Sequence, residues 1–484
     1  MSSSAKAEAA LALHRFGMGP RPGSIAAIES DPRGALIAEL DRSPLAAVSA
    51  PAAMLPSSAK AFRAVADANA KRQAKAIVAT KAQKEAASKM AEAPPMAEGT
   101  TPGMSAAAEK MAAEAIPDPG RGFYLQEAKL RIEAALSTEI GFVERLVWFW
   151  SNHFCISANK IQSMSGAYER EAIRPHVLGK FVDMLLAAEG HPAMLFYLDQ
   201  AASMGVNSIA GINRTRGLNE NLAREIMELH TLGVNGGYTQ ADVTSLARII
   251  TGWTFAGRDG KLAPPGTFVF FPNAHEPGPQ KLLGKVYEDT GVAQGETALA
   301  DIARHPATAK FIATKFVRHF IADDPPPALV TKLEATFKRT NGDLRAMTLA
   351  LVDADEAWRA PMTKIRMPYE YLVASGRMMG RIPEDPQRYL GGLNVLGQPL
   401  WAPAGPNGFA DTNAAWAAPE NIKLRLDIAS QISSRIADTI DPRALLDVVA
   451  GEAASTETRQ TIERAESKQQ AFALLLMSPE FQRR

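Results

Sequence analysis

Cysteine is almost absent from this sequence of 484 residues, and the shortage limits the chemistry available to the chain. The single cysteine, Cys155, cannot close an internal disulfide and cannot build a thiolate metal cluster. It stands between Phe154 and Ile156, a setting typical of a small buried hydrophobic residue rather than of a nucleophile. We therefore expect a packed core, and not covalent cross-links, to hold the fold together.

An excess of charge of one sign is also lacking. The chain has 53 Lys and Arg residues against 52 Asp and Glu residues, a formal net charge of +1. No overall field attracts such a protein to nucleic acid or to an anionic membrane. We therefore expect no nucleic-acid partner.

Long hydrophobic runs are missing as well. No stretch reaches the roughly 18 uncharged apolar residues of a membrane span, so no transmembrane segment is expected. Near the N-terminus, Lys6 and Glu8 stand where a signal peptide needs an apolar run. As written, the sequence predicts a cytoplasmic protein.

Several familiar sequence signatures are absent too. We find no Gly-rich phosphate loop after a strand, and no zincin or EF-hand motif. A nucleophile elbow and the kinase signature set are likewise missing. The chemistry of the chain has to be sought in its histidines, carboxylates and arginines.

Helical periodicity dominates what is present. Apolar side chains recur at helical spacing in the stripe Val143, Leu146, Val147, Trp150 and Phe154. A second apolar face follows the helix start His305-Pro306, and it consists of Phe311, Ile312, Phe316 and Phe320. Thr239 and Asp242 form a capping-box-like helix start.

Strand signals are few, and Thr267–Phe271 is the only convincing short run. The sequence therefore predicts a mainly α protein. We expect a multi-helix bundle around a single core, with a small β element near residues 267–287 and an exposed helical insertion.

The exposed insertion is expected in residues 59–120. This segment is rich in Ala, Lys, Glu and Met but poor in the large apolar residues that anchor a core face. We expect residues 1–58 to form the N-terminal helical part of the main domain and residues 121–484 the main helical domain. The arm at 59–120 is either merely solvent-exposed or a docking element for a protein partner.

Three segments carry a resemblance to a known family. They are Arg145-Leu-Val-Trp-Phe-Trp-Ser-Asn-His-Phe154, then Gly217-Leu-Asn-Glu-Asn-Leu-Ala-Arg-Glu-Ile-Met-Glu-Leu-His-Thr-Leu-Gly233, then Tyr238-Thr-Gln-Ala-Asp-Val243 with Thr251-Gly-Trp253. Together they resemble the bacterial family catalogued as domain of unknown function 1800. Weaker matches extend the resemblance over nearly the whole chain except the Ala- and Lys-rich insertion.

The resemblance implies more about fold than about chemistry, because the family has no known function. Its members are often exported and are often encoded beside another exported protein of unknown function. This implies a periplasmic or exported location and a protein partner. The chain departs from the family pattern at Ser151, where a histidine is frequent, and at Phe409, where a tryptophan is usual. The first departure weakens the idea that this segment supplies two histidine ligands.

Two histidines form the sharpest candidate site. On a regular helix, His230 falls on the apolar face of 219–233, and His153 lies at the edge of the 143–154 stripe. If Asp199 or Glu225 joined His153 and His230, the result would be a two-histidine, one-carboxylate site for a divalent metal. The alternative is a pair of structural histidines whose ring nitrogens are hydrogen-bonded in the core.

Candidates for catalysis are His230, Glu225 and His275. The last of these stands in a Pro- and Gly-rich loop, where a histidine is free either to reach a cleft or to pack in a turn.

An anion site is the second candidate. Arg214 and Arg216 precede the helix that starts near Asn219, and arginine forks beside free helix N–H groups bind anions. The alternative is structural ion pairing with nearby glutamates. The stretch 398–416, which holds Trp401, Phe409 and Trp416, either lines a carbohydrate or peptide groove or plugs a loop onto the core.

Two functions remain open. The first is a metal-assisted hydrolase or transferase acting on an anionic or saccharide substrate, with a divalent metal as cofactor. The second is a non-catalytic assembly or binding protein that docks a genomically neighbouring partner through the 59–120 arm.

Overall fold

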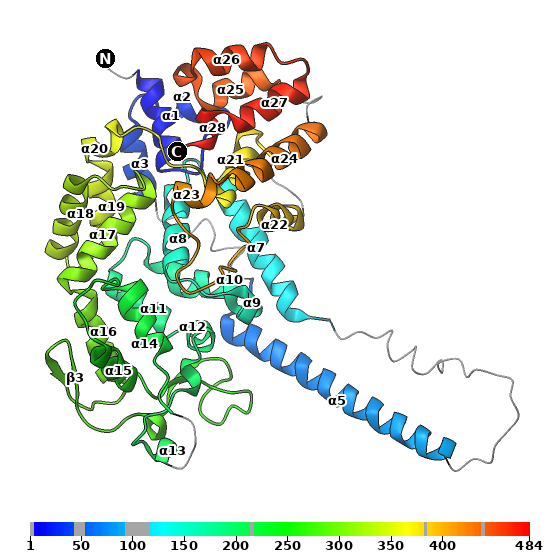
Figure 1. Ribbon diagram of the computed structural model, residues 1–484, viewed down its shortest axis with the longest axis vertical. Coiled ribbons are helices and arrows are strands. Elements are labelled where there is room, and N and C mark those ends of the chain that lie inside the picture. Colours follow the sequence, from blue (N-terminus) through cyan, green and yellow to red (C-terminus); the bar gives the residue numbers. More distant parts are fainter. Residues whose placement is uncertain (1–3, 43–53, 92–116, 213–216, 382–384, 437–440) are drawn as a thin grey trace, which may run out of the picture.

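The computed structural model describes residues 4–42, 54–91, 117–212, 217–381, 385–436 and 441–484. Helices make up most of the molecule, and one long helix projects from it (Figure 1). The prediction of a mainly α fold is confirmed. No helix in the described ranges is both long and apolar enough to cross a membrane.

The helices of the first half of the chain are short to medium in length, apart from the projecting one. In order they are α1 (Ala5–Arg15), α2 (Ser24–Ile28), α3 (Pro32–Asp41), α5 (Ser58–Ala91), α7 (Pro119–Ser137), α8 (Phe142–His153), α9 (Ala158–Ile161), α10 (Ser165–Tyr168), α11 (Phe181–Glu189), α12 (Pro192–Tyr197), α13 (Ile209–Ile212), α14 (Asn221–Glu225) and α15 (Gln240–Ile249).

The second half continues the pattern. Its helices are α16 (Val292–Ala303), α17 (Pro306–Phe320), α18 (Pro327–Arg339), α19 (Leu344–Val352), α20 (Asp355–Arg359), α21 (Pro368–Met378), α22 (Pro386–Val395), α23 (Asn413–Trp416), α24 (Pro419–Ile436), α25 (Pro442–Val449), α26 (Thr456–Glu463), α27 (Lys468–Met477) and α28 (Pro479–Gln482).

The β structure consists of two small antiparallel pairs in the described chain. Strand β1 (Trp253–Phe255) pairs with β2 (Phe268–Phe270), and β3 (Gln280–Leu282) pairs with β4 (Lys285–Tyr287). The predicted β element near 267–287 is confirmed, and its partner strand β1 follows α15 directly.

Helix α8 lies at the centre of the core. All five residues of the predicted stripe are buried, and Trp150 contacts the rings of Phe149, Phe154 and Phe181. The N-terminal helices lie beside the C-terminal ones at one end of the molecule, where His14 of α1 hydrogen-bonds the carbonyl of Val449 (Figure 1). One continuous hydrophobic cluster therefore includes residues from both ends of the chain.

Local signals placed several helix starts correctly. The predicted capping box is present, since Thr239 N–H donates to Asp242 Oδ2 at 2.9 Å and Thr239 Oγ1 accepts from Asp242 N–H at 3.3 Å. Helix α17 starts at Pro306 with His305 as its N-cap, also as predicted.

The segment 219–233 differs from expectation. It is not one regular α-helix, because α14 ends at Glu225 and a π-helical turn, η5 (Ile226–His230), follows. A second π-helical turn, η2 (Glu169–Ile173), follows α10. In a π-turn the backbone bonds run from i to i+5, so side chains no longer follow 100° steps.

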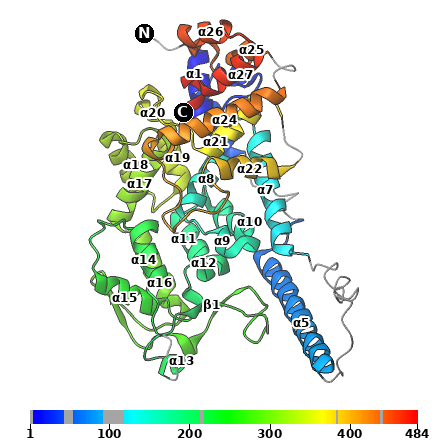
Figure 2. The same ribbon diagram turned by 45° about the vertical axis from the view of Figure 1, so that its right-hand side comes forward.

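Helix α5 leaves the body after its first turns. Its start packs against α7 and the 3₁₀ turn η1 (Gln162–Met164), and Ser58 hydrogen-bonds Glu171. The C-terminal part of the helix points away from the rest of the molecule (Figures 1 and 2). The predicted insertion, residues 59–120, thus projects from the body in its described part, α5, and residues 92–116 lie outside the described residues.

The backbone before α8 generates a first prediction. Gly141 caps α8 with φ 90°, and a Cβ added there would lie 2.6 Å from Met18 Cγ. Because a left-handed conformation costs an L-residue roughly 1–2 kcal/mol, Gly141→Ala should lower the free energy of unfolding by at least that amount. Urea denaturation measures the change.

The matched control is Gly122→Ala. Gly122 lies within α7 with nothing within 4 Å of its added Cβ. An alanine there should stabilise the protein by about 0.5–1 kcal/mol. Equal midpoints for the two variants would contradict the role assigned to Gly141.

Candidate functional site

His153 and His230 meet in the core. Their ring centroids lie 6.0 Å apart, and both side chains are buried. His153 Nε2 lies 3.0 Å from the carbonyl of His230, and His230 Nδ1 lies 2.7 Å from Glu189 Oε1. The predicted pair of histidines is thus brought together, but the neighbouring carboxylate is Glu189 at the end of α11, which the sequence analysis missed.

The other two predicted metal ligands lie elsewhere. Asp199 is exposed and pairs with Lys160 at 2.7 Å. Glu225 is half-buried, and desolvation raises its pKa. No three His, Cys, Asp or Glu side chains of the described chain are placed to hold one metal ion. The described structure therefore does not bring His153, Asp199, Glu225 and His230 together as one metal site, because Asp199 is exposed and pairs with Lys160.

The predicted anion site cannot be placed as a whole. Arg214 and Arg216 lie outside the described residues. Asn219 is engaged at the start of α14, where its Oδ1 accepts from Asn221 N–H at 2.9 Å and its Nδ2 donates to the carbonyl of Asp199 at 3.2 Å.

His275 is buried rather than free in a cleft. Its Nδ1 lies 2.8 Å from the carbonyl of Thr251, and the neighbouring Glu276 accepts two hydrogen bonds from Asn207. The contact with Thr251 holds the loop against the segment that precedes β1. The contacts of His275, a predicted catalytic candidate, are therefore structural.

A cavity of about 190 Å³ lies between α8, α17 and residues 407–412. We call it the Lys315 cavity. The chemistry-bearing residues that line it are Asn152, His153, Lys315, Arg318, His319 and Asp411, and aromatic walls come from Trp148, Phe149 and Phe409. Lys315, Arg318 and His319 stand at i, i+3 and i+4 of α17, so one helix face presents all three.

Lys315 has a neutral partner. Its Nζ donates to His153 Nδ1 at 2.9 Å, and His153 Nε2–H points at the carbonyl of His230, which fixes the ring tautomer. Burial, followed by the charge of Lys315, holds the pKa of His153 well below its ordinary value. Burial also lowers the pKa of Lys315 to about 8. The lysine is therefore an ammonium group below about pH 8, and within the described chain one of its three donors makes a hydrogen bond.

His319 and Asp411 form a dyad in the same cavity. His319 Nδ1 lies 2.6 Å from Asp411 Oδ2, and His319 Nε2 has no hydrogen-bond partner among the described residues. Burial lowers the pKa of His319 to about 4. Burial alone would raise the pKa of Asp411, but His319, Lys364 and Arg484 hold it well below its usual value.

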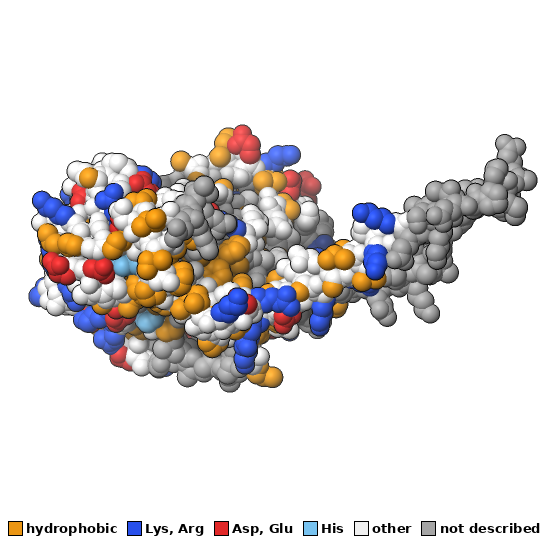
Figure 3. All heavy atoms as spheres, turned by 90° about the horizontal axis from the view of Figure 1, so that it is seen from below, with side chains coloured by type: hydrophobic (Ala, Val, Ile, Leu, Met, Phe, Trp, Pro, Cys, Tyr) orange, Lys and Arg blue, Asp and Glu red, His pale blue; other side chains and the backbone are white. Residues whose placement is uncertain are grey.

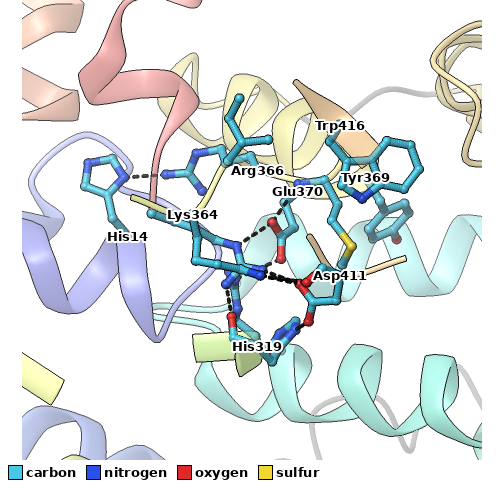
Figure 4. A network of polar contacts seen from close by, with 12 residues as sticks. His14, His319, Lys364, Arg366, Tyr369, Glu370, Asp411 and Trp416 are labelled. Carbon is cyan, nitrogen blue, oxygen red and sulfur yellow. Dashed lines mark hydrogen bonds and ion pairs between the residues drawn. The ribbon is translucent and has the colours of Figure 1, made fainter. Parts of the chain in front are cut away.

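A buried ion cluster contacts Asp411 of this dyad (Figure 4). Lys364 Nζ lies 3.0 Å from Asp411 Oδ1, and Arg484 lies 3.5 Å from the same oxygen. Arg484 also binds Glu370 at 2.7 Å, and Arg145 of α8 binds the other oxygen of Glu370 at 2.8 Å. Asp411 thus belongs both to the cavity wall and to the cluster.

Sequence patterns alone do not single out Lys315, Arg318, His319 or Asp411. One signal was available, because Lys315 and His319 adjoin Phe316 and Phe320 on a helix whose apolar face had been identified. Polar residues at the border of a buried helix face indicate a cavity only when the segment that lies opposite that face is also known. That segment, residues 407–412, is distant in sequence.

One protein-family model matches nearly the whole chain. A family model described as "Protein of unknown function (DUF1800)" matches residues 11–483. No curated protein matches the chain. No solved structure matches it either.

Burial of neutral histidines predicts acid sensitivity. The pKa of His14 is lowered to about 3, by burial and then by Arg366, and that of His319 to about 4, against an ordinary 6.5. Below about pH 6.5 the unfolded chain binds protons that the folded chain does not, so the free energy of unfolding should fall as pH drops. The loss should approach about 1.4 kcal/mol per pH unit for each such histidine.

Urea unfolding between pH 8 and 4.5 tests this expectation. The window lies above the region in which Glu370, with a pKa of about 2, is protonated. His14→Gln keeps a donor and an acceptor and should reduce the slope by one histidine's share. An unchanged slope in this variant would show that His14 is not buried as a neutral ring.

Proposed function

We propose that this chain, which belongs to the family of proteins of unknown function DUF1800, is a hydrolase or transferase acting on a small anionic substrate in the Lys315 cavity. The observation that carries the proposal is that Lys315 and Arg318, which lack a carboxylate partner in the described chain, line the same cavity as the His319 ring, which Asp411 orients. Perturbed titratable groups that converge on a cavity are typical of active sites.

Two cations of the cavity lack a carboxylate partner in the described chain. Lys315 donates to the neutral His153, and Arg318 Nε donates to the backbone carbonyl of Asp323 at 3.2 Å. The one carboxylate in the wall, Asp411, is already bound by Lys364, Arg484 and His319. An anionic ligand would therefore gain charge-assisted hydrogen bonds from Lys315 and Arg318.

His319 is the proposed general base. Asp411 holds its Nδ1–H, which leaves the lone pair of Nε2 available, and the low pKa keeps the ring neutral at physiological pH. A neutral imidazole oriented by a carboxylate removes a proton from water or from a hydroxyl group in hydrolases and transferases. Lys315, protonated below about pH 8, would stabilise negative charge that develops on the substrate.

The proposal draws on no metal ion. Our first hypothesis joined His153 and His230 to Asp199 or Glu225, and the described residues give those two histidines no such third ligand. The anionic substrate of that hypothesis is kept, and the groups that bind it are different.

A second candidate function is the docking of a protein partner through α5. The helix projects from the body, with Lys and Arg side chains along its described part (Figure 3). Ile77 and Val78 are 70% and 59% exposed on it. The two functions are separable, because only the second depends on the arm.

Anion binding tests the proposal directly. Inorganic phosphate, sulfate and small carboxylates should raise the Tm of the protein, since a ligand that binds only the folded state stabilises it. Lys315→Met should weaken this binding about ten- to a hundredfold, the effect of one charge-assisted hydrogen bond. Binding should also weaken above about pH 8, where Lys315 loses its proton.

The control is Lys310→Met, an exposed lysine on the same helix that does not line the cavity. Phosphate, sulfate and carboxylate esters should be screened as substrates. For any ester that is turned over, His319→Gln should lower kcat about 10²–10⁴-fold, while the variant still binds that ester. Equal anion affinity in Lys315→Met and Lys310→Met would overturn the proposed site.

A further inference from the structure

A smaller cavity, of about 60 Å³, adjoins the Lys315 cavity. Four residues line both hollows, namely Trp148, Asn152, Met367 and Phe409. We call the smaller one the Leu400 cavity, because Leu400 lines it and does not line the Lys315 cavity. Apart from Asn152, Pro399 and Phe409, which are half-buried, every residue of its lining is buried. The Leu400 cavity is therefore a space inside the protein and not a hydrated part of its surface.

The amide side chains of the lining already have partners in the protein. Asn152 Oδ1 accepts from Phe409 N–H at 2.8 Å, and Asn152 Nδ2 donates to the Phe409 carbonyl at 2.9 Å. Gln398 Oε1 accepts from Tyr369 N–H at 2.9 Å. A water molecule in a cavity needs about two to four polar partners. An apolar group therefore suits this lining better than water does.

The two charged residues of the lining are paired as well. Arg131 Nε lies 2.9 Å from both carboxylate oxygens of Glu169, and Glu370 binds Arg484 at 2.7 Å. The Arg131 guanidinium also lies 4.6–5.6 Å from the ring centroids of Tyr369, Trp148 and Trp401. It takes the position over these rings that a ligand cation would need. The cavity thus admits a neutral, apolar group.

The volume of the Leu400 cavity limits the size of that group. An apolar cavity of about 150 Å³ is large enough to bind benzene, which has six carbon atoms. In proportion, the 60 Å³ of the Leu400 cavity holds about two to three carbon atoms. A short aliphatic chain fits this space, and a phenyl ring does not.

The wall between the two cavities suits a ligand that occupies both. Met367 is unbranched and changes conformation readily, and the Phe409 ring is half-buried although its backbone is held by Asn152. Arg484 also connects the two linings, since it binds Glu370 of the Leu400 cavity and Asp411 of the Lys315 cavity (Figure 4).

We propose that the Leu400 cavity binds the short aliphatic chain of an anion whose charged head lies in the Lys315 cavity. The substrate class is then a small anion that carries a chain of about two to three carbon atoms. This inference rests on the proposed function, because Lys315 and Arg318 are the groups that hold the head.

Calorimetry on the full chain with two matched ligand series tests the proposal. The series are monoalkyl phosphates from methyl to hexyl and alkanoates from acetate to octanoate. In at least one series the affinity should rise about fourfold for each added methylene, up to a chain of about three carbons beyond the head. It should then fall, because a longer chain meets the buried wall. The series that behaves in this way identifies the head group.

Two substitutions of Leu400 should change the dependence on chain length in opposite directions. Leu400→Ala enlarges the cavity and should move the optimum to chains about two carbons longer. Leu400→Trp fills the cavity and should abolish the gain from chain length. Neither should change the affinity for inorganic phosphate or formate, and Leu400→Ala carries the test alone if the tryptophan variant does not fold.

The matched control is Leu445→Ala. Leu445 of α25 is 6% exposed against 5% for Leu400, and it lines neither cavity. This variant should keep the optimum of the unchanged chain. Anions that bind with no dependence on chain length, or an optimum that shifts equally in Leu400→Ala and Leu445→Ala, would overturn this inference alone. Binding of none of the anions would overturn both the proposed function and this inference.

Discussion

The structure depends on one buried carboxylate, Glu370. Its two oxygens bind Arg145 from the central helix α8 and Arg484 from the far end of the sequence, at 2.8 and 2.7 Å. All three side chains are at most 2% exposed. Removing one member of such a group would leave an uncompensated buried charge, which costs about 3–5 kcal/mol. The ion cluster therefore joins helices α8 and α21 to Arg484 in the core.

The same cluster sets the electrostatics of the Lys315 cavity. Arg484 binds both Glu370 and Asp411, so the positive charge that stabilises the fold also keeps Asp411 ionised. Arg484 and Arg145 lower the pKa of His319 further than burial alone, against the opposing effect of Asp411. The dyad is thus a neutral imidazole beside a permanent carboxylate, and its protonation state follows from the packing of residues that do not line the cavity.

Sequence patterns predicted what is local. The α8 stripe, the Thr239 cap, the start of α17, the small β element and the exposed arm follow from spacing and composition. The site does not, because His319 and Asp411 are 92 positions apart and meet only through tertiary packing. His230 is buried beside His153, as its place on the apolar face predicted, although the π-turn at Ile226–His230 departs from the regular helix assumed for this segment. Glu189 is a further case, because no spacing in the sequence relates the end of α11 to His230.

The contrast between Arg377, which is buried, and Lys315, which is partly buried, argues that the cavity is more than a packing defect. Arg377 donates to backbone carbonyls at the end of α7 and before α8, so its positive charge is satisfied by fixed dipoles. Lys315 has one hydrogen-bond acceptor in the described chain, the neutral His153, and its ammonium group lies 5.4 Å from the ring centroid of Phe311. A desolvated ammonium group without an ionic partner is costly. An anion bound between Lys315, Arg318 and the oriented His319 would supply the charged partner that this lysine lacks in the described chain.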